Sequence, residues 1–306
     1  MPALTIPAFG STALVEREPA RPGSGEVRIR VEAAPVHPVD VWVHDGRLAA
    51  LLPGEPPYVA GWGVAGVVDE VGPGVDDLAV GDAVLGLSDW FDTFVGTHAS
   101  TVVLPARAVG RRPAGLDAVA AAALSLNALT ALQALDLVGL TSGTLGITGA
   151  AGGVGGYALE LARLRGLDVV ALAREGDREF VERTGARLAV RPDDIADTAA
   201  ALTAVAGPLD GVLDAALLAD RALPAVRDGG VFLGLTGPAT PPAERGIRAE
   251  AVQVVGDWAQ LSSLAELAAS GAISTRVAAT YPLAEADQAY RAVLDGGLRG
   301  VVVLVP

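Results

Sequence analysis

The chain has 306 residues, enough for two domains and a large buried core. Apolar residues make up 51% and charged residues 19%, which excludes a disordered protein. The absence of cysteine excludes disulfides, thiolate metal sites and cysteine nucleophiles. The net charge is −14 and no basic stripe is present, so we expect no binding to nucleic acid.

Residues 1–7 contain neither a basic segment nor an apolar core, so we expect no secretory signal and a cytoplasmic location. Two long stretches, 118–135 and 137–159, carry no charge. The first contains several polar residues and the second is rich in glycine, so both are expected to be buried elements rather than membrane spans. We therefore expect no membrane partner.

The first 110 residues predict a largely β domain. They are rich in Val, Gly and Pro, and residues 26–31 alternate polar and apolar side chains as a half-buried strand does. Further strands are expected at 64–71, 81–86 and 100–105, and a turn is indicated by Gly72-Pro-Gly74.

From about residue 113 the pattern changes to alternating helices and strands. One or two helices are expected over 116–136, and the last helices over 260–269 and 286–294. Strands are expected at 144–148, 168–173, 186–190, 211–214, 230–235, 251–255 and 301–305. Alternation of this kind predicts a doubly wound parallel sheet, so the fold class is α/β.

A glycine-rich turn at 149–156 lies between a short apolar strand and a helix. Its pattern, Ala150-x-Gly152-x-x-Gly155, is a variant of the dinucleotide-binding fingerprint. Small residues are needed there because the turn is tight, the backbone approaches a pyrophosphate, and the helix packs closely on the sheet. The helix N-terminus then offers free N–H groups to the phosphates.

In order and spacing, several short motifs together resemble the zinc-free medium-chain dehydrogenase/reductases of the quinone oxidoreductase (zeta-crystallin-like) group. The motifs span nearly the whole chain and lie at 25–31, 38–40, 61–72, 80–84, 129–131, 149–155, 184–186 and 300–304. The resemblance implies a GroES-like β domain formed from both chain ends (1–112 and 257–306) and a central Rossmann domain (113–256). It also implies a cofactor cleft between the domains, and a homodimer paired through the sheet edge at 251–255.

The second strand of the Rossmann unit ends in Ala173, where NAD-binding units carry an acidic residue for the ribose 2′-hydroxyl. Arg174 and Arg178 follow and can bind a 2′-phosphate, so we expect NADPH as the cofactor. The neighbouring Glu175 and Asp177 leave a second interpretation open, in which the arginines only pair with these carboxylates. The expected cofactor-binding residues are Thr130, Ala150, Gly152, Gly153, Val154, Gly155, Arg174, Arg178 and Thr236.

We expect no catalytic metal. The zinc-dependent relatives carry cysteine at the position of His37 and a His-Glu pair at the positions of Trp62 and Gly63. A site made of the three histidines, His37, His44 and His98, is the open alternative, because catalytic zinc needs about three protein ligands.

Without a metal, the reaction that the resemblance implies is hydride addition to a quinone or to the β-carbon of an enone. His37, Asp40 and Trp42 are the expected catalytic residues, with His37 as hydrogen-bond donor or general acid and Trp42 as a pocket wall. A histidine bonded only to backbone, and an aspartate that only caps a helix, are the structural alternatives. Trp62, Trp90, Phe91 and Asn127 are expected to line the substrate pocket, and His44 and His98 to lie at the surface or cleft rim.

The leading hypothesis is thus an NADPH-dependent reductase of a small-molecule quinone or α,β-unsaturated carbonyl. The changes at His37, Trp42 and Gly63 leave two other functions open. One is a non-redox isomerase, lyase or cyclase on the same fold, and the other is a catalytically silent NADPH-binding protein.

Overall fold

The computed structural model describes residues 1–306 and divides into two compact units. The first unit contains Met1–Leu126 and Val255–Pro306, so both chain ends contribute to it, and the second contains Asn127–Val254. The first junction therefore follows Leu126 rather than residue 112. The physical reason is that helix α3 (Ala118–Ser125) packs against strands of the first unit.

The second unit is the predicted doubly wound sheet. Its six strands are all parallel and lie in the order β10-β9-β8-β11-β12-β13, in which the winding direction reverses between β8 and β11. The strands are β8 (Thr144–Thr148), β9 (Asp168–Ala173), β10 (Arg187–Val190), β11 (Leu209–Asp214), β12 (Val226–Gly234) and β13 (Arg248–Ala251).

The helices of this unit are α4 (Asn127–Val138), α5 (Gly153–Leu164), α6 (Arg178–Arg183) and α7 (Thr198–Ala206). Inner strands such as β9, in which residues 169–173 are all apolar and buried, are nearly continuous apolar runs because helices cover both faces of a parallel sheet. Leu202, Val212 and Phe232, all fully buried, belong to one apolar core under α7.

The last strand of the sheet differs from the prediction. It runs over Arg248–Ala251 instead of 251–255, because its register is set by β12, which ends at Gly234. The N–H of Val252 still donates to the Gly234 carbonyl, and residues 252–257 then form no strand. One edge of β13 has no strand beside it.

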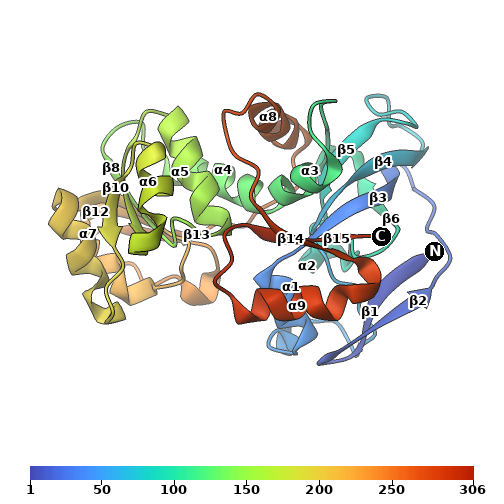
Figure 1. The fold of residues 1–306 in the computed structure, drawn as a ribbon, viewed down its shortest axis with the longest axis horizontal. Helices are drawn as coiled ribbons and strands as arrows, with labels where there is room; N and C mark the ends of the chain where they lie inside the picture. The colour runs from blue at the N-terminus through green and yellow to red at the C-terminus, as the bar shows by residue number, and fades with distance from the viewer. The chain divides into compact units, whose positions relative to one another are not determined.

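The first unit is built on a mixed sheet in the order β14-β15-β3-β4-β5-β7, with β6 also paired to β3. Its strands are β3 (Glu26–Val36), β4 (Gly63–Val71), β5 (Ala83–Leu87), β6 (Thr101–Pro105), β7 (Val109–Arg111), β14 (Val277–Pro282) and β15 (Val301–Val305). A separate hairpin consists of β1 (Pro2–Ala8) and β2 (Ser11–Glu16). Both termini lie in this unit (Figure 1).

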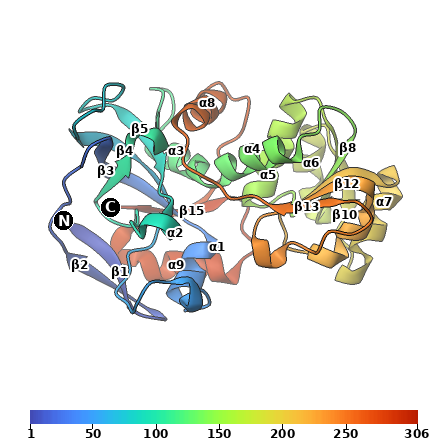
Figure 2. The same cartoon turned by 180° about the vertical axis from the view of Figure 1, so that it is seen from behind.

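The other helices of the first unit are α1 (Pro38–His44), α2 (Trp90–Thr93), α8 (Trp258–Ala269) and α9 (Ala286–Asp295). Figures 1 and 2 show α1 and α9 side by side, so two segments far apart in sequence meet there. The sheet core alternates as predicted, since Val27, Ile29 and Val31 of β3 are buried together. This mixed sheet and the parallel sheet together confirm the predicted α/β fold class.

The segment Ala118–Val138 is long and apolar enough to cross a membrane by length and composition. Most of it is buried inside the protein, and a turn at Leu126 separates it into α3 and α4. Core helices have the same properties, so the segment is weak support for a membrane span.

We expect Gly66→Ala to destabilise the first unit by at least about 2 kcal/mol, because a well-packed position tolerates no added methyl group. A Cβ on Gly66 of β4 would overlap the carbonyl oxygen of Arg30 on the paired strand β3. Urea unfolding followed by tryptophan fluorescence measures the effect, since Trp42, Trp62, Trp90 and Trp258 all lie in the first unit.

Gly115→Ala is the matched control. Its Cβ would meet no atom within 4 Å and its backbone is not left-handed, so stability should stay the same or rise slightly. Equal unfolding midpoints for the two variants would contradict the packing argument.

Candidate active site

His37 and Asp40 form a buried titratable pair at the start of α1. The exposed fraction is 2% for His37 and zero for Asp40. Oδ2 of Asp40 accepts the main-chain N–H of His37 at 2.7 Å and lies 3.5 Å from its Nδ1. Asp40 therefore caps helix α1, as the structural alternative for this residue predicts. It does so from the third helical position.

Three polar atoms of this pair have no hydrogen-bond partner in the protein: both ring nitrogens of His37 and Oδ1 of Asp40. The ring of His37 lies close to the backbone of Asp40 at the start of α1, but neither ring nitrogen makes a hydrogen bond of normal geometry. Buried polar groups without partners are rare and are retained where a ligand or reaction uses them. The sequence-predicted catalytic residues His37 and Asp40 thus lie together in the interior, with three polar atoms that no protein group satisfies.

His98 is fully buried, which corrects the prediction that it lies at the surface or cleft rim. Its Nε2 lies 3.0 Å from the Pro35 carbonyl oxygen, and its Nδ1 lies 2.9 Å from the hydroxyl of Tyr290 on α9. A carbonyl only accepts, so Nε2 carries the proton and Nδ1 accepts from Tyr290. Burial lowers the pKa of His98 and raises that of Tyr290 well above its usual value, so both side chains are neutral.

Tyr290 has no chemical motif around it in the sequence. The signal that could have found it is the buried stripe of the amphipathic helix α9, which also contains Ala286 and Ala289. The ring of the half-buried His44 contacts the same tyrosine, with 5.2 Å between ring centroids. Burial also lowers the pKa of His44.

The predicted aromatic pocket residues do cluster. Trp62 lies 4.8 Å from Trp90 and 5.5 Å from Phe91, measured between ring centroids. Trp90 is fully buried, and its indole N–H donates to the carbonyl of Val59 at 2.8 Å. It is therefore a core residue that anchors α2. Phe91 is 41% exposed and Trp62 only 5%, so Phe91 is the member of this group that reaches the surface.

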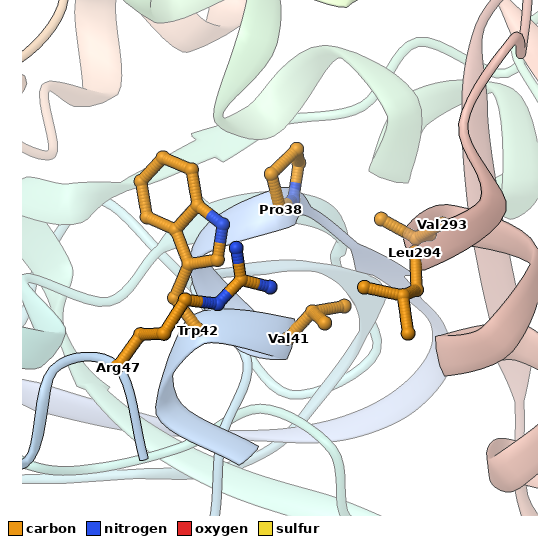
Figure 3. Close-up of a pocket in the computed structure, with 6 residues that line it drawn as sticks. All are labelled: Pro38, Val41, Trp42, Arg47, Val293 and Leu294. Atoms are coloured by element: carbon orange, nitrogen blue, oxygen red, sulfur yellow. The ribbon is translucent and has the colours of Figure 1, made fainter. Parts of the chain in front are cut away.

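Trp42 lines a small open pocket of about 110 Å³ between α1 and α9 (Figure 3). The other lining residues are Pro38, Val41, Arg47, Val293 and Leu294. Trp42 therefore forms part of the wall of this pocket, and its role toward a substrate stays a prediction. The sequence offered no reason to single out Arg47.

The residues present do not fit a catalytic zinc ion. No group of three His, Cys, Asp or Glu side chains is arranged to hold a metal. Both ring nitrogens of His98 already have partners, which removes it from a tri-histidine site. A side chain at Gly63, where zinc-dependent relatives carry glutamate, would overlap Ser125 Oγ and come within 2.8 Å of Pro35.

In the second unit, the glycine turn is shaped to admit a phosphate. Gly149 has a left-handed backbone (φ 57°), and a Cβ on Gly155 would overlap the Gly149 carbonyl. Helix α5 starts after Gly152 without a side-chain cap, so its first N–H groups remain open to an anion. Ala150, Gly152, Gly153, Val154 and Gly155 all lie in this turn or in the first turn of α5.

Asn127 lies against the turn as well: a Cβ on Gly153 would be 2.8 Å from its Nδ2. The structure therefore brings Asn127, predicted for the substrate pocket, to the phosphate-binding turn. Thr130 is buried on the same helix. Thr236 follows β12, and its carbonyl accepts the hydroxyl of Thr240 at 3.0 Å.

The loop after β11, which lies beside the glycine turn, lacks the glycines that are usual at this strand end. Asp214 fixes the loop instead. It is fully buried at the end of β11 and accepts the Thr148 hydroxyl at 2.5 Å and the Ala219 N–H at 2.8 Å. Burial raises the pKa of this carboxyl. Leu217 and Ala219 both adopt left-handed backbone conformations (φ 57° and 50°), which the bond to Asp214 helps to hold.

The two predicted phosphate-binding arginines differ in what they contact. Arg178 pairs with Glu175 through Nε and Nη2, at 2.6 and 2.9 Å, and with Glu182 through Nη1, at 3.1 Å. Arg174 is exposed and makes no ion pair. Arg191, not predicted, is also exposed without an ion pair, and its N–H donates to the Ala173 carbonyl at 2.8 Å. Arg174 and Arg191 are thus the free cations at the ends of β9 and β10.

We expect the stability contributed by His98 to decrease in acid. Because its pKa in the folded protein is below the unfolded value of about 6.5, the unfolded chain binds a proton that the folded protein does not. The wild type should therefore lose up to about 1.4 kcal/mol per pH unit from this group below pH 6.5. The measurement is urea unfolding by tryptophan fluorescence at pH 7.5 and 5.5.

His98→Gln is the comparison. The variant should be less stable than the wild type at pH 7.5, because two buried hydrogen bonds are altered, and its deficit should shrink at pH 5.5. A deficit that stays constant across the pH range would show that His98 does not remain neutral in the folded protein.

Comparisons with known proteins agree with the two-unit fold described above. Residues 23–114 match the alcohol dehydrogenase GroES-like domain, and residues 184–304 match the zinc-binding dehydrogenase model. A chloroplast envelope quinone oxidoreductase homolog from Arabidopsis thaliana is 30% identical over 93% of this chain and 91% of its own length.

The 2-haloacrylate reductase of a Burkholderia species is 48% identical, but over only 21% of this chain and 19% of the reductase. A quinone oxidoreductase structure from Coxiella burnetii has the same fold, with a TM-score of 0.87, 24% identity, and coverage of 100% of this chain and 99% of that one. The full-length relative and the matched domains show that the chain belongs to the quinone oxidoreductase group of the medium-chain dehydrogenase/reductases, an oxidoreductase family that binds a nicotinamide cofactor.

Proposed function

We propose that this protein is an NADPH-dependent, metal-independent reductase that transfers hydride to a small-molecule quinone or to the C=C bond of an α,β-unsaturated carbonyl. The observation that carries the proposal is the buried His37–Asp40 pair, which has three polar atoms without partners in a family of nicotinamide oxidoreductases. When bound, the nicotinamide supplies a hydride.

The glycine turn and the uncapped start of α5 would hold the cofactor diphosphate. Arg174 and Arg191, which have no internal carboxylate partner, would bind a 2′-phosphate, whereas Arg178 is already neutralised by Glu175 and Glu182. Ala173 places no carboxylate where it would repel that phosphate. This free pair of guanidinium groups favours NADPH over NADH.

His37 would hold the proton that the reduced acceptor needs. Hydride addition leaves negative charge on the carbonyl oxygen, and a protonated imidazole nitrogen can donate a hydrogen bond or the proton to it. Asp40 positions His37, because its Oδ2 accepts the main-chain N–H of that residue. Trp42 would supply a flat apolar wall that suits a conjugated acceptor.

The proposal includes a homodimer. Strand β13 has one edge without a neighbouring strand, and its unpaired backbone groups could join the same strand of a second copy.

We expect purified protein, dialysed against a chelator, to oxidise NADPH when a simple quinone or enone is added. Absorbance at 340 nm measures the reaction. His37→Ala should lower kcat by about 10²- to 10⁴-fold, because a general acid is removed, while NADPH still binds.

Two controls separate the hypotheses. Loss of the solvent hydrogen isotope effect in His37→Ala would identify its role as proton transfer, since a merely structural change would leave that effect unaltered. NADPH binding without reduction of any acceptor would contradict the reductase proposal and favour the non-redox enzyme or the silent binding protein.

We expect Arg174→Gln to raise the KM for NADPH about 10- to 100-fold and to leave the KM for NADH nearly unchanged. This is the loss that follows when one charge-assisted hydrogen bond of about 1.5–3 kcal/mol is removed. Arg191→Gln should act in the same direction. Steady-state kinetics with both cofactors measures the effect.

Arg178→Gln should change the NADPH KM less than threefold, since its guanidinium already pairs with two carboxylates. Arg183→Gln, an exposed change on the same helix, is the neutral control. A larger effect at position 178 than at 174, or equal kcat/KM for the two cofactors in the wild type, would contradict the assignment.

A further inference from the structure

The pocket between α1 and α9 has apolar walls and a single charged group. Pro38, Val41 and Trp42 of α1 form one side, and Val293 and Leu294 of α9 form the other (Figure 3). The guanidinium of Arg47, three residues after the end of α1, lies among these side chains. All six residues belong to the first unit.

The Arg47 guanidinium is held in place and keeps donors free. It lies over the indole of Trp42, with 5.9 Å from Cζ to the ring centroid. One carboxylate oxygen of Asp45, Oδ2, lies 2.7 Å from Nε and 2.6 Å from Nη2 of Arg47 and accepts from both. Nη1 has no partner in the protein, so one amino group of this half-exposed guanidinium can donate to a ligand in the pocket.

The size of the pocket limits what it can take. Its volume is about 110 Å³, and a cavity of about 150 Å³ is enough to hold benzene. A short planar fragment of three or four carbons fits this space. Its complementary head group is a small anion that a guanidinium binds well, of which a carboxylate is the leading example.

We propose that this pocket is a carboxylate subsite, so that the acceptor reduced by this protein is the anion of a short α,β-unsaturated acid. The inference rests on the proposed reductase function. It extends that function because His37 directly precedes Pro38, the first pocket residue, and Trp42 belongs to the same helix. A carboxylate at Arg47 would therefore lie beside α1, the helix whose N-cap is the proposed proton donor.

The simpler explanation is that Arg47 only pairs with Asp45 on the surface, an interaction that stabilises proteins little. The chain offers a matched example of that situation. Arg30 pairs with Glu32, also two residues away, and its side chain is 54% exposed compared with 52% for Arg47, but it lines no part of the pocket. Arg30→Gln is therefore the control for loss of such a pair.

The test measures binding of crotonate, a four-carbon unsaturated acid, by calorimetry and by competitive inhibition of the reduction of the neutral ketone 3-penten-2-one. Arg47→Gln should weaken crotonate binding at least 10-fold, and Arg47→Lys less, because it keeps the charge. Asp45→Asn should strengthen binding several-fold, since it removes the competing carboxylate. Arg30→Gln should bind crotonate as the wild type does.

Equal crotonate affinity in wild type and Arg47→Gln would overturn the proposal, and so would weaker binding in Asp45→Asn. A rise in the NADPH KM of Arg47→Gln that equals the loss of crotonate affinity would overturn it too, because the anion at Arg47 would then be a cofactor phosphate. Unfolding midpoints of the variants identify any loss of crotonate binding that is caused by misfolding. If Arg47→Gln is misfolded, the crotonate affinity of Arg47→Lys decides whether the subsite proposal holds.

Binding does not require turnover, so the two proposals fail separately. Crotonate binding that depends on Arg47, without reduction of any acceptor, would support the subsite and contradict the reductase. Reduction of 3-penten-2-one without crotonate binding would support the reductase and contradict the subsite.

Discussion

The imidazole of His98 is hydrogen-bonded on both sides, to the carbonyl of Pro35 and to the hydroxyl of Tyr290. These two bonds join the end of β3, the loop before β6 and the C-terminal helix α9, three segments that the chain order keeps far apart. Pro35 lies two residues before His37, and α9 forms one wall of the Arg47 pocket. One buried neutral histidine therefore connects the segments that position the candidate site in the first unit.

Buried polar groups serve opposite purposes within a short distance in this unit. His98 and Tyr290 satisfy each other and have the rigidity of a completed network. His37 and Asp40 are equally buried but leave three atoms without partners, which costs stability unless a ligand arrives. The same division occurs in the second unit, where Asp214 is fully engaged while the start of α5 stays open. His37 and Asp40 thus differ from His98, Tyr290 and Asp214 in whether their hydrogen bonds are complete, and not in how deeply they are buried.

Much of the fold could be predicted from sequence because local patterns set it. The strands Thr144–Thr148, Asp168–Ala173 and Val301–Val305 have their predicted limits, since turns of glycine or charged residues bound each apolar run. Strand β13 was misplaced because its register comes from pairing with β12, which no local pattern encodes. The domain junction was placed too early because α3 resembles any alanine-rich helix until its packing partners are known.

The partners of the candidate site residues could be predicted less well than the residues themselves. The family resemblance singled out His37, Asp40 and Trp42, which lie in the structure at the N-cap of α1 and within that helix. The burial of His98 could not be foreseen, because a single histidine in a loop has no periodicity. Whether Arg174 or Arg178 is free depends on side-chain pairing, which the charges nearby suggest for both.

The packing around Gly63 limits which side chains position 63 can carry. Zinc-dependent relatives carry glutamate where Gly63 stands, and here that volume is filled by a serine from α3 and by Pro35. New ligands at positions 37, 62 and 63 alone would therefore not create a zinc site in this protein. Ser125 and its neighbours would have to change with them, so the construction of a metal centre here is a problem of core packing before it is one of coordination chemistry.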